Sequence, residues 1–281
     1  MNTALLAGVS PAAFACFNGP VVPFRARYKP GRVEVKAKTK DEGEVWVYGN
    51  VGDSWWEEGV TAKGMADQLK ALGDVKTLNV YINSGGGSVF EGVAIYNTLR
   101  RHRARKIVHI DGLAASIASV IAMAGDEIRI AVNGLVMIHN PWGVAVGEAK
   151  DFRKMADSLD KIRGAIVDTY ELRTGQTAED LSAMMDDETW MNAEEALAAG
   201  FVDAITDAVE QAAFADVDVS AFRHAPETLK AAAAAEPAAP AEPEAPASPQ
   251  QPEAADEVGK PHLAIAKAAA ALRRRGISVP A

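Results

Sequence analysis

The sequence has a single cysteine, few aromatic residues and fewer basic than acidic side chains, and each shortage argues against a class of protein. Cys16 has no second cysteine to pair with, so we expect neither an internal disulfide framework nor a cysteine-rich zinc site. The formal net charge of −9 argues against a nucleic-acid-binding surface as the main function. No stretch approaches the roughly 18 uninterrupted apolar residues of a membrane helix. We therefore expect a soluble, cytoplasmic protein with neither a nucleic-acid nor a membrane partner.

The first 43 residues are predicted to form an extended arm. Prolines at 20, 23 and 30 stand among scattered basic residues, a composition typical of an unpacked segment. The apolar start has some character of a signal peptide, but no Lys or Arg precedes the apolar run and Pro11 interrupts it. Secretion is therefore not expected.

Residues 44–210 predict an α/β domain, because strand-like and helix-like segments alternate along them. With 48% hydrophobic residues, the 281-residue chain can bury a sizeable core. Asn133-Gly134 predicts a tight turn between two of the strands. The expected strands are 44–48, 78–82, 106–110, 127–132, 135–139, 189–191 and 201–205, and the longer expected helices are 61–72, 90–101, 147–173, 177–184 and 192–199.

The composition changes near residue 225. Residues 211–260 are predicted to be a linker, rich in Ala, Pro and Glu from about 226, with seven prolines between Pro226 and Pro252. Such a segment cannot build a core and is expected to be a semi-stiff, disordered tail. Residues 261–281 could form a short helix, which needs a partner for stability and would serve as a docking peptide.

The stretch KIVHIDGLAASIASVI, residues 106–121, predicts a buried strand, a turn at Gly112 and a helix that Ser116 opens. At such a strand-to-helix turn the backbone N–H groups are free and the helix dipole favours developing negative charge. Ser116 is therefore a candidate nucleophile, although the G-x-S-x-G spelling of a nucleophile elbow is absent. The alternative is that Ser116 and Ser119 are small residues that pack a buried helix.

The loop NSGGGS, residues 83–88, lies between a predicted strand and a predicted helix. No Gly-Lys-Ser/Thr follows it, so it is not a phosphate-binding P-loop, and its spacing does not fit a dinucleotide fingerprint. A backbone nearly free of side chains can still bring N–H groups close to a ligand carbonyl. The alternative is a plain turn.

His139 is the preferred candidate for a general base. It ends an apolar strand, at the same edge of the sheet that should carry the 83–88 loop and Ser116, and sites in α/β sheets gather at that edge. His109, inside the strand that leads to Ser116, is the rival. Either could equally be a structural histidine.

Three carboxylates in a row, Asp186, Asp187 and Glu188, precede Trp190. Such a run is usually a solvated turn. One of the three could also orient the imidazole through its second nitrogen, since a catalytic histidine needs a partner that holds the useful tautomer.

Four blocks of sequence together resemble a known family. They are YINSGGGSVFEGVAIYNTLR, GLAASIAS, MIHNPWG and ETWMNAEEALAAGFVD, and they stand in the order and with the spacing of the Clp protease proteolytic subunits. The resemblance covers about residues 44–206. It is closest to the Clp-like head maturation proteases that tailed phages and prophages encode.

This resemblance implies a ClpP/crotonase-like α/β fold, built from repeated β-β-α units, and a self-compartmentalising serine endopeptidase that forms homo-oligomeric rings. Ser116 matches the family's nucleophile and His139 its general base. Gly87 and Ile117 match the backbone N–H donors of its oxyanion hole. Neither a cofactor nor a metal is implied, and the partners are protein or peptide substrates.

The sequence departs from the family at two positions. Where the family has an aspartate as the third member of the triad, this chain has Glu188, with Asp187 as the fallback. Glutamate can hold an imidazole but has a longer side chain. Gly85 stands where cellular Clp subunits usually have proline, which loosens the loop and leaves its N–H groups in place.

Three functions follow from these residues. The leading hypothesis is a phage prohead protease that cleaves capsid or scaffold proteins, in the host cytoplasm or the prohead, with the Ala/Pro/Glu-rich tail as a docking extension. The second is a housekeeping Clp subunit that works with a separate ATP-driven unfoldase. The third is an inactive assembly scaffold on the same fold, and an acyl-CoA-binding crotonase is a further alternative because its fold shares the glycine-rich loop.

Overall fold

A single sheet of eight strands lies at the centre of the computed structural model, which describes residues 32–53, 59–208, 222–227 and 229. The strands are β1 (Arg32–Ala37), β2 (Glu42–Val51), β3 (Thr77–Gly87), β4 (Arg105–Ala115), β5 (Glu127–Ala131), β6 (Leu135–Ile138), β7 (Thr189–Asn192) and β8 (Ala204–Thr206). The helices are α1 (Ala62–Leu72), α2 (Val89–Arg101), α3 (Ile117–Ala122), α4 (Ala149–Thr174), α5 (Ala178–Asp186) and α6 (Ala193–Ala198).

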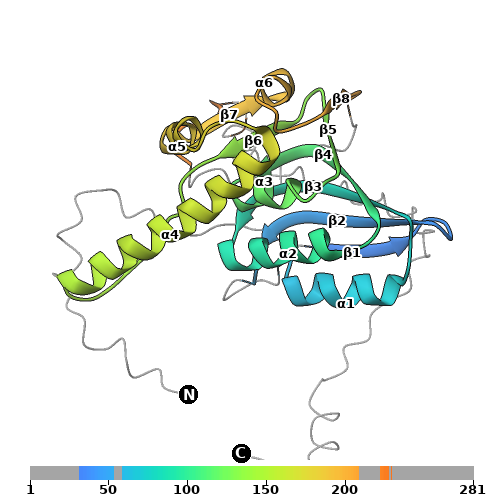
Figure 1. Cartoon of the computed structure of the whole chain (residues 1–281), viewed down its shortest axis with the longest axis horizontal. Helices are drawn as coiled ribbons and strands as arrows, with labels where there is room; N and C mark the ends of the chain where they lie inside the picture. Colours follow the sequence, from blue (N-terminus) through green and yellow to red (C-terminus); the bar gives the residue numbers. More distant parts are fainter. Residues whose placement is uncertain (1–31, 54–58, 209–221, 228, 230–281) are drawn as a thin grey trace, which may run out of the picture. The chain divides into compact units, whose positions relative to one another are not determined.

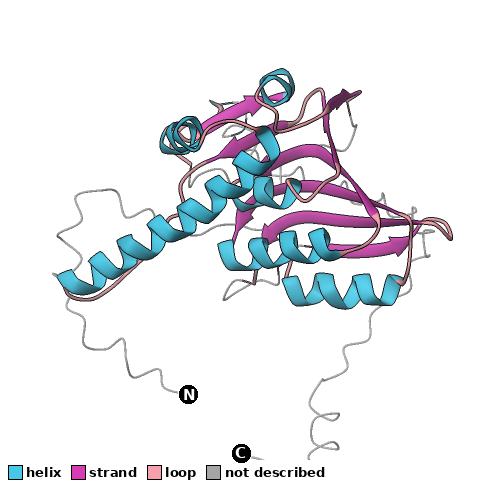
Figure 2. Ribbon diagram, viewed as in Figure 1, coloured by secondary structure: helices cyan, strands magenta, loops and turns pink. Residues whose placement is uncertain are grey.

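The strands follow the order β1-β2-β3-β4-β5-β8, and β6 and β7 extend the sheet beside the end of β4. The pairs from β2 to β5, and β5 with β8, are parallel, whereas β1 and β7 run antiparallel to their neighbours. Helices α1, α2 and α3 lie over one face of this sheet (Figures 1 and 2). The structure is therefore the α/β fold expected from the sequence.

The main core lies between these helices and the sheet. Alternate residues of the central strands point into it, as the fully buried Val45 and Val47 of β2 show, and Met65 of α1 and Ile95 of α2 meet them from the other side. Each fully buried side chain of this kind contributes about 1.5–3 kcal/mol relative to an exposed one. This packing fixes the carboxyl ends of the parallel strands relative to one another.

Local signals in the sequence begin and end the helices as predicted. The Thr61 hydroxyl accepts a hydrogen bond from the Gly64 N–H (3.1 Å) at the start of α1. Asn192 and Glu195 form a capping box at the start of α6. Gly175 ends α4 in the left-handed conformation (φ 72°).

The sheet begins before the predicted boundary at residue 44. Residues 32–37, which the sequence assigned to an extended arm, form strand β1, and β2 already starts at Glu42. β1 pairs antiparallel with β2 from Arg32↔Tyr48 to Ala37↔Gly43. The arm, if there is one, therefore lies within residues 1–31, outside the part of the chain that is described.

Of two turns predicted near the site, the one at Gly112 is absent and the one at Asn133-Gly134 is present. Strand β4 runs straight through Gly112 to Ala115, so no glycine turn precedes Ser116. The turn at Asn133-Gly134 exists, with the Gly134 N–H bonded to the Ala131 carbonyl (2.7 Å), but it does not make a hairpin. Instead β5 and β6 pair one after the other, both parallel to β4.

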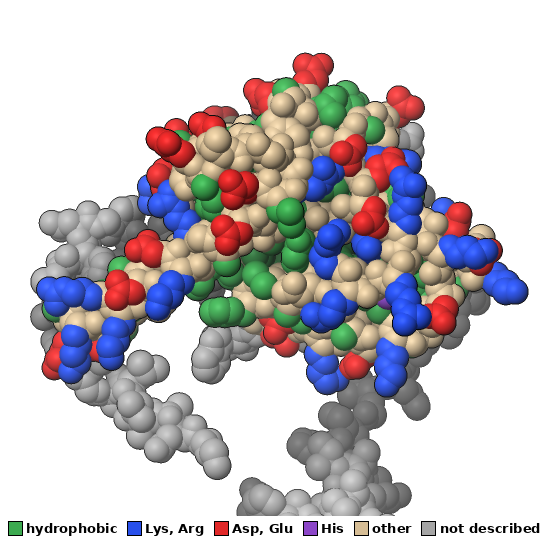
Figure 3. Space-filling view, in the orientation of Figure 1, with side chains coloured by type: hydrophobic (Ala, Val, Ile, Leu, Met, Phe, Trp, Pro, Cys, Tyr) green, Lys and Arg blue, Asp and Glu red, His purple; other side chains and the backbone are tan. Residues whose placement is uncertain are grey.

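Helix α4 reaches beyond the edge of the sheet (Figure 1). Basic and acidic side chains both cover its outer half, and hydrophobic side chains gather near its approach to α2 (Figure 3). The residues before α4 leave Val144 and Val146 almost fully exposed.

No helix in the described ranges has both the length and the apolar character to cross a membrane. The Ala/Pro/Glu-rich tail from 230 and the predicted docking helix at 261–281 fall outside these ranges.

Candidate active site

Ser116 lies at the junction of β4 and α3, in a backbone conformation that few residues adopt. Its φ and ψ are 55° and −130°, and only one other non-glycine residue in the described ranges, Glu188, has a positive φ. Such a conformation costs about 1–3 kcal/mol and persists only where the surroundings enforce it. Here the Ser116 N–H donates to the Met137 carbonyl (2.9 Å), which ties the junction to β6.

His139 comes next to Ser116 because β4 and β6 are parallel neighbours. The register pairs Ala115 with Met137, so the residues that follow each strand emerge at the same edge of the sheet. His139 Nε2 lies 2.7 Å from Ser116 Oγ. This distance is within the range for proton transfer between a nucleophile and its base.

The imidazole of His139 favours its neutral form. Burial lowers its pKa below the usual 6.5, the Arg223 charge lowers the pKa further, and the Glu188 carboxylate opposes both. A neutral imidazole can accept the Ser116 proton, so the electrostatics suit a general base.

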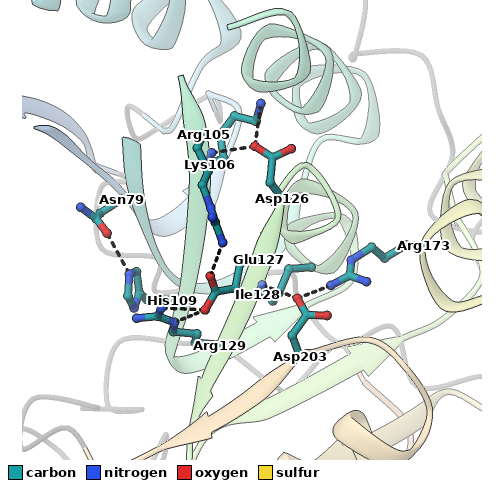
Figure 4. Close-up of polar contacts among 10 residues, drawn as sticks. All are labelled: Asn79, Arg105, Lys106, His109, Asp126, Glu127, Ile128, Arg129, Arg173 and Asp203. Atoms are coloured by element: carbon teal, nitrogen blue, oxygen red, sulfur yellow. Dashed lines mark hydrogen bonds and ion pairs between the residues drawn. The ribbon is translucent and has the colours of Figure 1, made fainter. Parts of the chain in front are cut away.

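The rival histidine, His109, has a different environment. It lies on β4 seven residues before Ser116, a separation of about 20 Å along a strand. Its ring stacks on Tyr81 (4.8 Å between centroids) and its Nε2 lies 3.2 Å from Asn79 Oδ1. Figure 4 shows His109 among ion pairs from β4 and β5, such as Arg105–Glu127. The structure therefore places it apart from the Ser116–His139 pair.

The glycine-rich segment lies directly against Ser116. Its last glycines, Gly86 and Gly87, are not a loop but the end of β3, paired with Asn50 and Val51 of β2. Gly86 has φ +100°, and a Cβ atom there would lie 2.6 Å from the Ser116 Cβ. Only glycine lets the backbone approach the serine so closely.

Two backbone N–H groups remain the predicted oxyanion donors. Ile117 is the first residue of α3, so its N–H has no acceptor within the helix. Gly87, at φ +141°, follows Gly86 at the exposed end of β3. Their roles stay predictions.

Among the three acidic residues, Glu188 has the environment of a functional carboxylate. Its side chain is 8% exposed and its φ is 51°. Oε2 accepts from the Arg223 N–H (2.9 Å), and Oε1 accepts from the His224 N–H (2.7 Å) and from Trp190 Nε1 (3.3 Å). Burial alone would raise its pKa, but the hydrogen bonds from His224 and Arg223 outweigh it and hold the pKa below the usual value.

The other two carboxylates are turned elsewhere. Asp186 bonds to Asn140 Nδ2 (2.7 Å) and to Arg163 (2.9 Å), and the Asp187 side chain is exposed. No hydrogen bond joins Glu188, or either aspartate, to His139 within the described structure. The carboxylate of Glu188 nevertheless acts on the imidazole through its charge. The structure thus assembles a serine–histidine pair with a buried acid close by.

One part of this site was not predicted from the sequence. Residues 222–227 and 229, assigned to the linker, pack against it: the Phe222 ring meets the His139 ring edge-on (5.4 Å) and the Trp190 ring (5.6 Å). Ala225 and Leu229 are buried. The only signal was the spacing of Phe222, Ala225 and Leu229, three and four residues apart, which the following prolines masked.

The arrangement suits acyl transfer. A nucleophile–base pair at a strained strand-to-helix junction, beside backbone N–H groups, has the parts needed to form and stabilise a tetrahedral intermediate. No group of three or more His, Cys, Asp or Glu side chains in the described ranges is arranged to hold a metal ion.

Comparison with known protein families matches residues 35–209 to the family described as Clp protease. The match covers well over half of the chain and includes Ser116, His139 and Glu188. It starts within β1, in agreement with the sheet beginning before residue 44, and it ends before the segment that starts at Phe222.

Proposed function

This chain belongs to the Clp protease family, and we propose that it is a serine endopeptidase with Ser116 as nucleophile and His139 as general base. The family consists of peptidases, generally of the serine type, that form oligomeric rings and act on proteins. The observation that supports these two roles is the 2.7 Å contact between Ser116 Oγ and His139 Nε2.

In the proposed mechanism, His139 takes the Ser116 proton as Oγ attacks a peptide carbonyl. The N–H groups of Gly87 and Ile117 would hold the oxyanion that forms, a contribution of about 2.7–4 kcal/mol per donor. His139 then gives its proton to the leaving amine. Water attacks the acyl-enzyme with His139 again as the base, and the proton returns to Ser116 Oγ as the acyl group leaves. Glu188 is the proposed third member, with Asp187 as the fallback.

The acidic limb of the pH profile should have its midpoint below the usual histidine value. Only neutral His139 can accept the proton, so kcat/KM should rise as the pH increases through the His139 pKa, which burial lowers below 6.5. A profile of kcat/KM for a peptide substrate between pH 4 and 8 measures this. A midpoint above 6.5 would contradict the described environment of the imidazole.

The proposed nucleophile is tested by labelling the purified protein with a fluorophosphonate probe and mapping the modified peptide. Modification of Ser116 is the expected result. Modification of another residue, with Ser116 unmodified, would overturn the assignment. A protein that no such probe modifies would instead favour an inactive scaffold, and binding of acyl-CoA would favour a crotonase.

For the biological role, we propose a phage prohead protease that processes capsid or scaffold proteins in the host cytoplasm or the prohead. The resemblance of the four blocks to phage-encoded proteases supports this role, as does the Ala/Pro/Glu-rich tail. The alternative is a housekeeping subunit with a separate ATPase, since the matched family is described only as Clp protease. Cleavage confined to capsid or scaffold proteins would support the first role, and ATPase-dependent degradation of a folded substrate the second.

A further inference from the structure

Residues 222–227 and 229 lie against the catalytic pair from outside the span that matches the family, and we call them the strap. Three apolar side chains anchor it: Phe222 at the His139 and Trp190 rings, and Ala225 and Leu229 in a small apolar cluster. That cluster is separate from the main core, and its other buried members are Leu113, Ala115 and Met137.

The polar contacts of the strap converge on the end of α5. Two successive backbone N–H groups, from Arg223 and His224, bind the two oxygens of the Glu188 carboxylate. The His224 ring reaches the neighbouring carbonyl of Asp187, with Nδ1 at 2.7 Å. Together with Trp190 Nε1, the strap thus accounts for every hydrogen bond described for the Glu188 side chain.

In a working triad, the acid accepts a hydrogen bond from the Nδ1–H of the base, which fixes its tautomer and orientation. Here that bond is absent although Glu188 and His139 are close enough to influence each other's charge. The hydrogen bonds described for the carboxylate oxygens come from the strap and from Trp190, and none comes from the imidazole. In this arrangement the acid is bonded to the strap and not to the base.

We propose that the strap is an autoinhibitory element, which holds Glu188 away from His139 and keeps the triad incomplete until the strap is released. This inference rests on the proposed serine protease function. Release frees both carboxylate oxygens from the Arg223 and His224 N–H groups and uncovers the imidazole edge that Phe222 contacts. Glu188 then accepts the His139 Nδ1–H.

The strap has the features of a releasable contact. It is held by three apolar side chains, and Arg223 and His224 are exposed. Its donors to Glu188 are backbone groups, so they are lost when the segment moves and not when one side chain changes. Backbone donors could alternatively support the acid in an active arrangement, and the two cases predict opposite effects of removing the strap.

Removing the strap should raise activity. We compare a chain that ends at Ala221, the strap-free chain, with a matched chain that ends at Lys230 and keeps the strap but loses the same downstream residues. The strap-free chain should have a kcat/KM at least about tenfold higher, within the roughly 10⁴-fold range attributed to the acid of a triad. Adding a peptide of residues 222–230 should reverse the gain.

A second variant tests release in the full-length protein. Ala225→Glu places a charge in the buried cluster, where Ala225 is 3% exposed, and should expel the strap and raise activity. Ala156→Glu adds the same charge at an exposed position of α4 and serves as the control. Unchanged or lower activity in both the strap-free chain and Ala225→Glu, with the fold intact, would show that the strap supports the site and would overturn the proposal.

The role of Glu188 should depend on the strap. Glu188→Gln should lower kcat strongly, by about 10³–10⁴-fold, in the strap-free chain and only slightly in the full-length protein, where the acid is already withheld. Glu171→Gln, the same substitution at an exposed position of α4, should change neither. An equal loss from Glu188→Gln in both chains would contradict the competition between strap and base.

A spectroscopic measurement separates this inference from the protease function itself. A downfield imidazole Nδ1 proton resonance, assigned with His139→Gln, should be present in the strap-free chain and absent in the chain ending at Lys230. If neither chain labels at Ser116, the protease function fails, and the resonance still decides whether the strap controls the Glu188–His139 bond. The same resonance in both chains would overturn the autoinhibitory role.

Discussion

Ser116→Ala is expected to abolish both peptide hydrolysis and fluorophosphonate labelling while leaving the fold intact. In serine proteases of this kind, loss of the nucleophile lowers kcat by about 10⁶-fold, because the base and the acid have no other oxygen to activate. The alanine side chain fits the same place, and no described hydrogen bond of the fold other than that to His139 uses the hydroxyl. Hydrolysis assays, labelling and circular dichroism of the purified variant measure these effects.

Ser119→Ala is the matched control, one helical turn further along. The Ser119 hydroxyl donates to the Ser116 carbonyl (2.5 Å) and receives a hydrogen bond from the buried Tyr170 hydroxyl (2.7 Å), so its role is structural. Its loss should lower the free energy of unfolding by about 1–3 kcal/mol and leave labelling at Ser116 in place. Labelling that persists in Ser116→Ala, or disappears only in Ser119→Ala, would refute the assignment of the nucleophile.

Gly86→Ala should nearly abolish activity by displacing the nucleophile. The new Cβ would lie 2.6 Å from the Ser116 Cβ and 2.9 Å from the Ala115 carbonyl oxygen, and neither is the end of a flexible side chain. We expect a destabilisation of about 1–3 kcal/mol from the φ of +100° and about 1–3 kcal/mol more from overpacking. A displacement of about 1 Å already costs on the order of 100-fold in rate.

The control is the same substitution at Gly164, an exposed position within α4 where a Cβ meets nothing within 4 Å. Gly164→Ala should raise the free energy of unfolding by about 0.5–1 kcal/mol and leave kcat unchanged. Chemical denaturation and steady-state kinetics of both variants provide the comparison. A fully active Gly86→Ala enzyme would mean that the end of β3 does not constrain Ser116.

The fold class and the serine–histidine pair could be predicted from the sequence. Alternating strand and helix patterns identify the α/β domain, and the parallel strands then bring Ser116 and His139 to one edge of the sheet. Sequence periodicity predicts local helices and strands but not which strands pair with one another. It therefore predicted a turn at Gly112, where pairing with β6 keeps β4 extended, and it assigned residues 32–37 to an arm, where pairing with β2 makes them a strand.

The proposed third member of the triad was the hardest part to predict, for a physical reason. The environment of Glu188 is made by Trp190, two residues away, and by Arg223 and His224, more than thirty residues away. No local pattern encodes a contact with a segment that reads as the start of a proline-rich tail. Burial and hydrogen bonding distinguish Glu188 from Asp186 and Asp187, and both are tertiary properties.

Different contacts hold the residues of this site in place. Ser116 and His139 follow adjacent, parallel-paired strands of the sheet, so their spacing is tied to the β4–β6 pairing. Glu188 follows α5, and two of the three hydrogen bonds described for its side chain come from the strap, which only three apolar side chains anchor. On the autoinhibition proposal, the molecule combines a fixed Ser116–His139 pair with an acid whose engagement is an equilibrium, and its activity can be graded by that equilibrium without rebuilding the core.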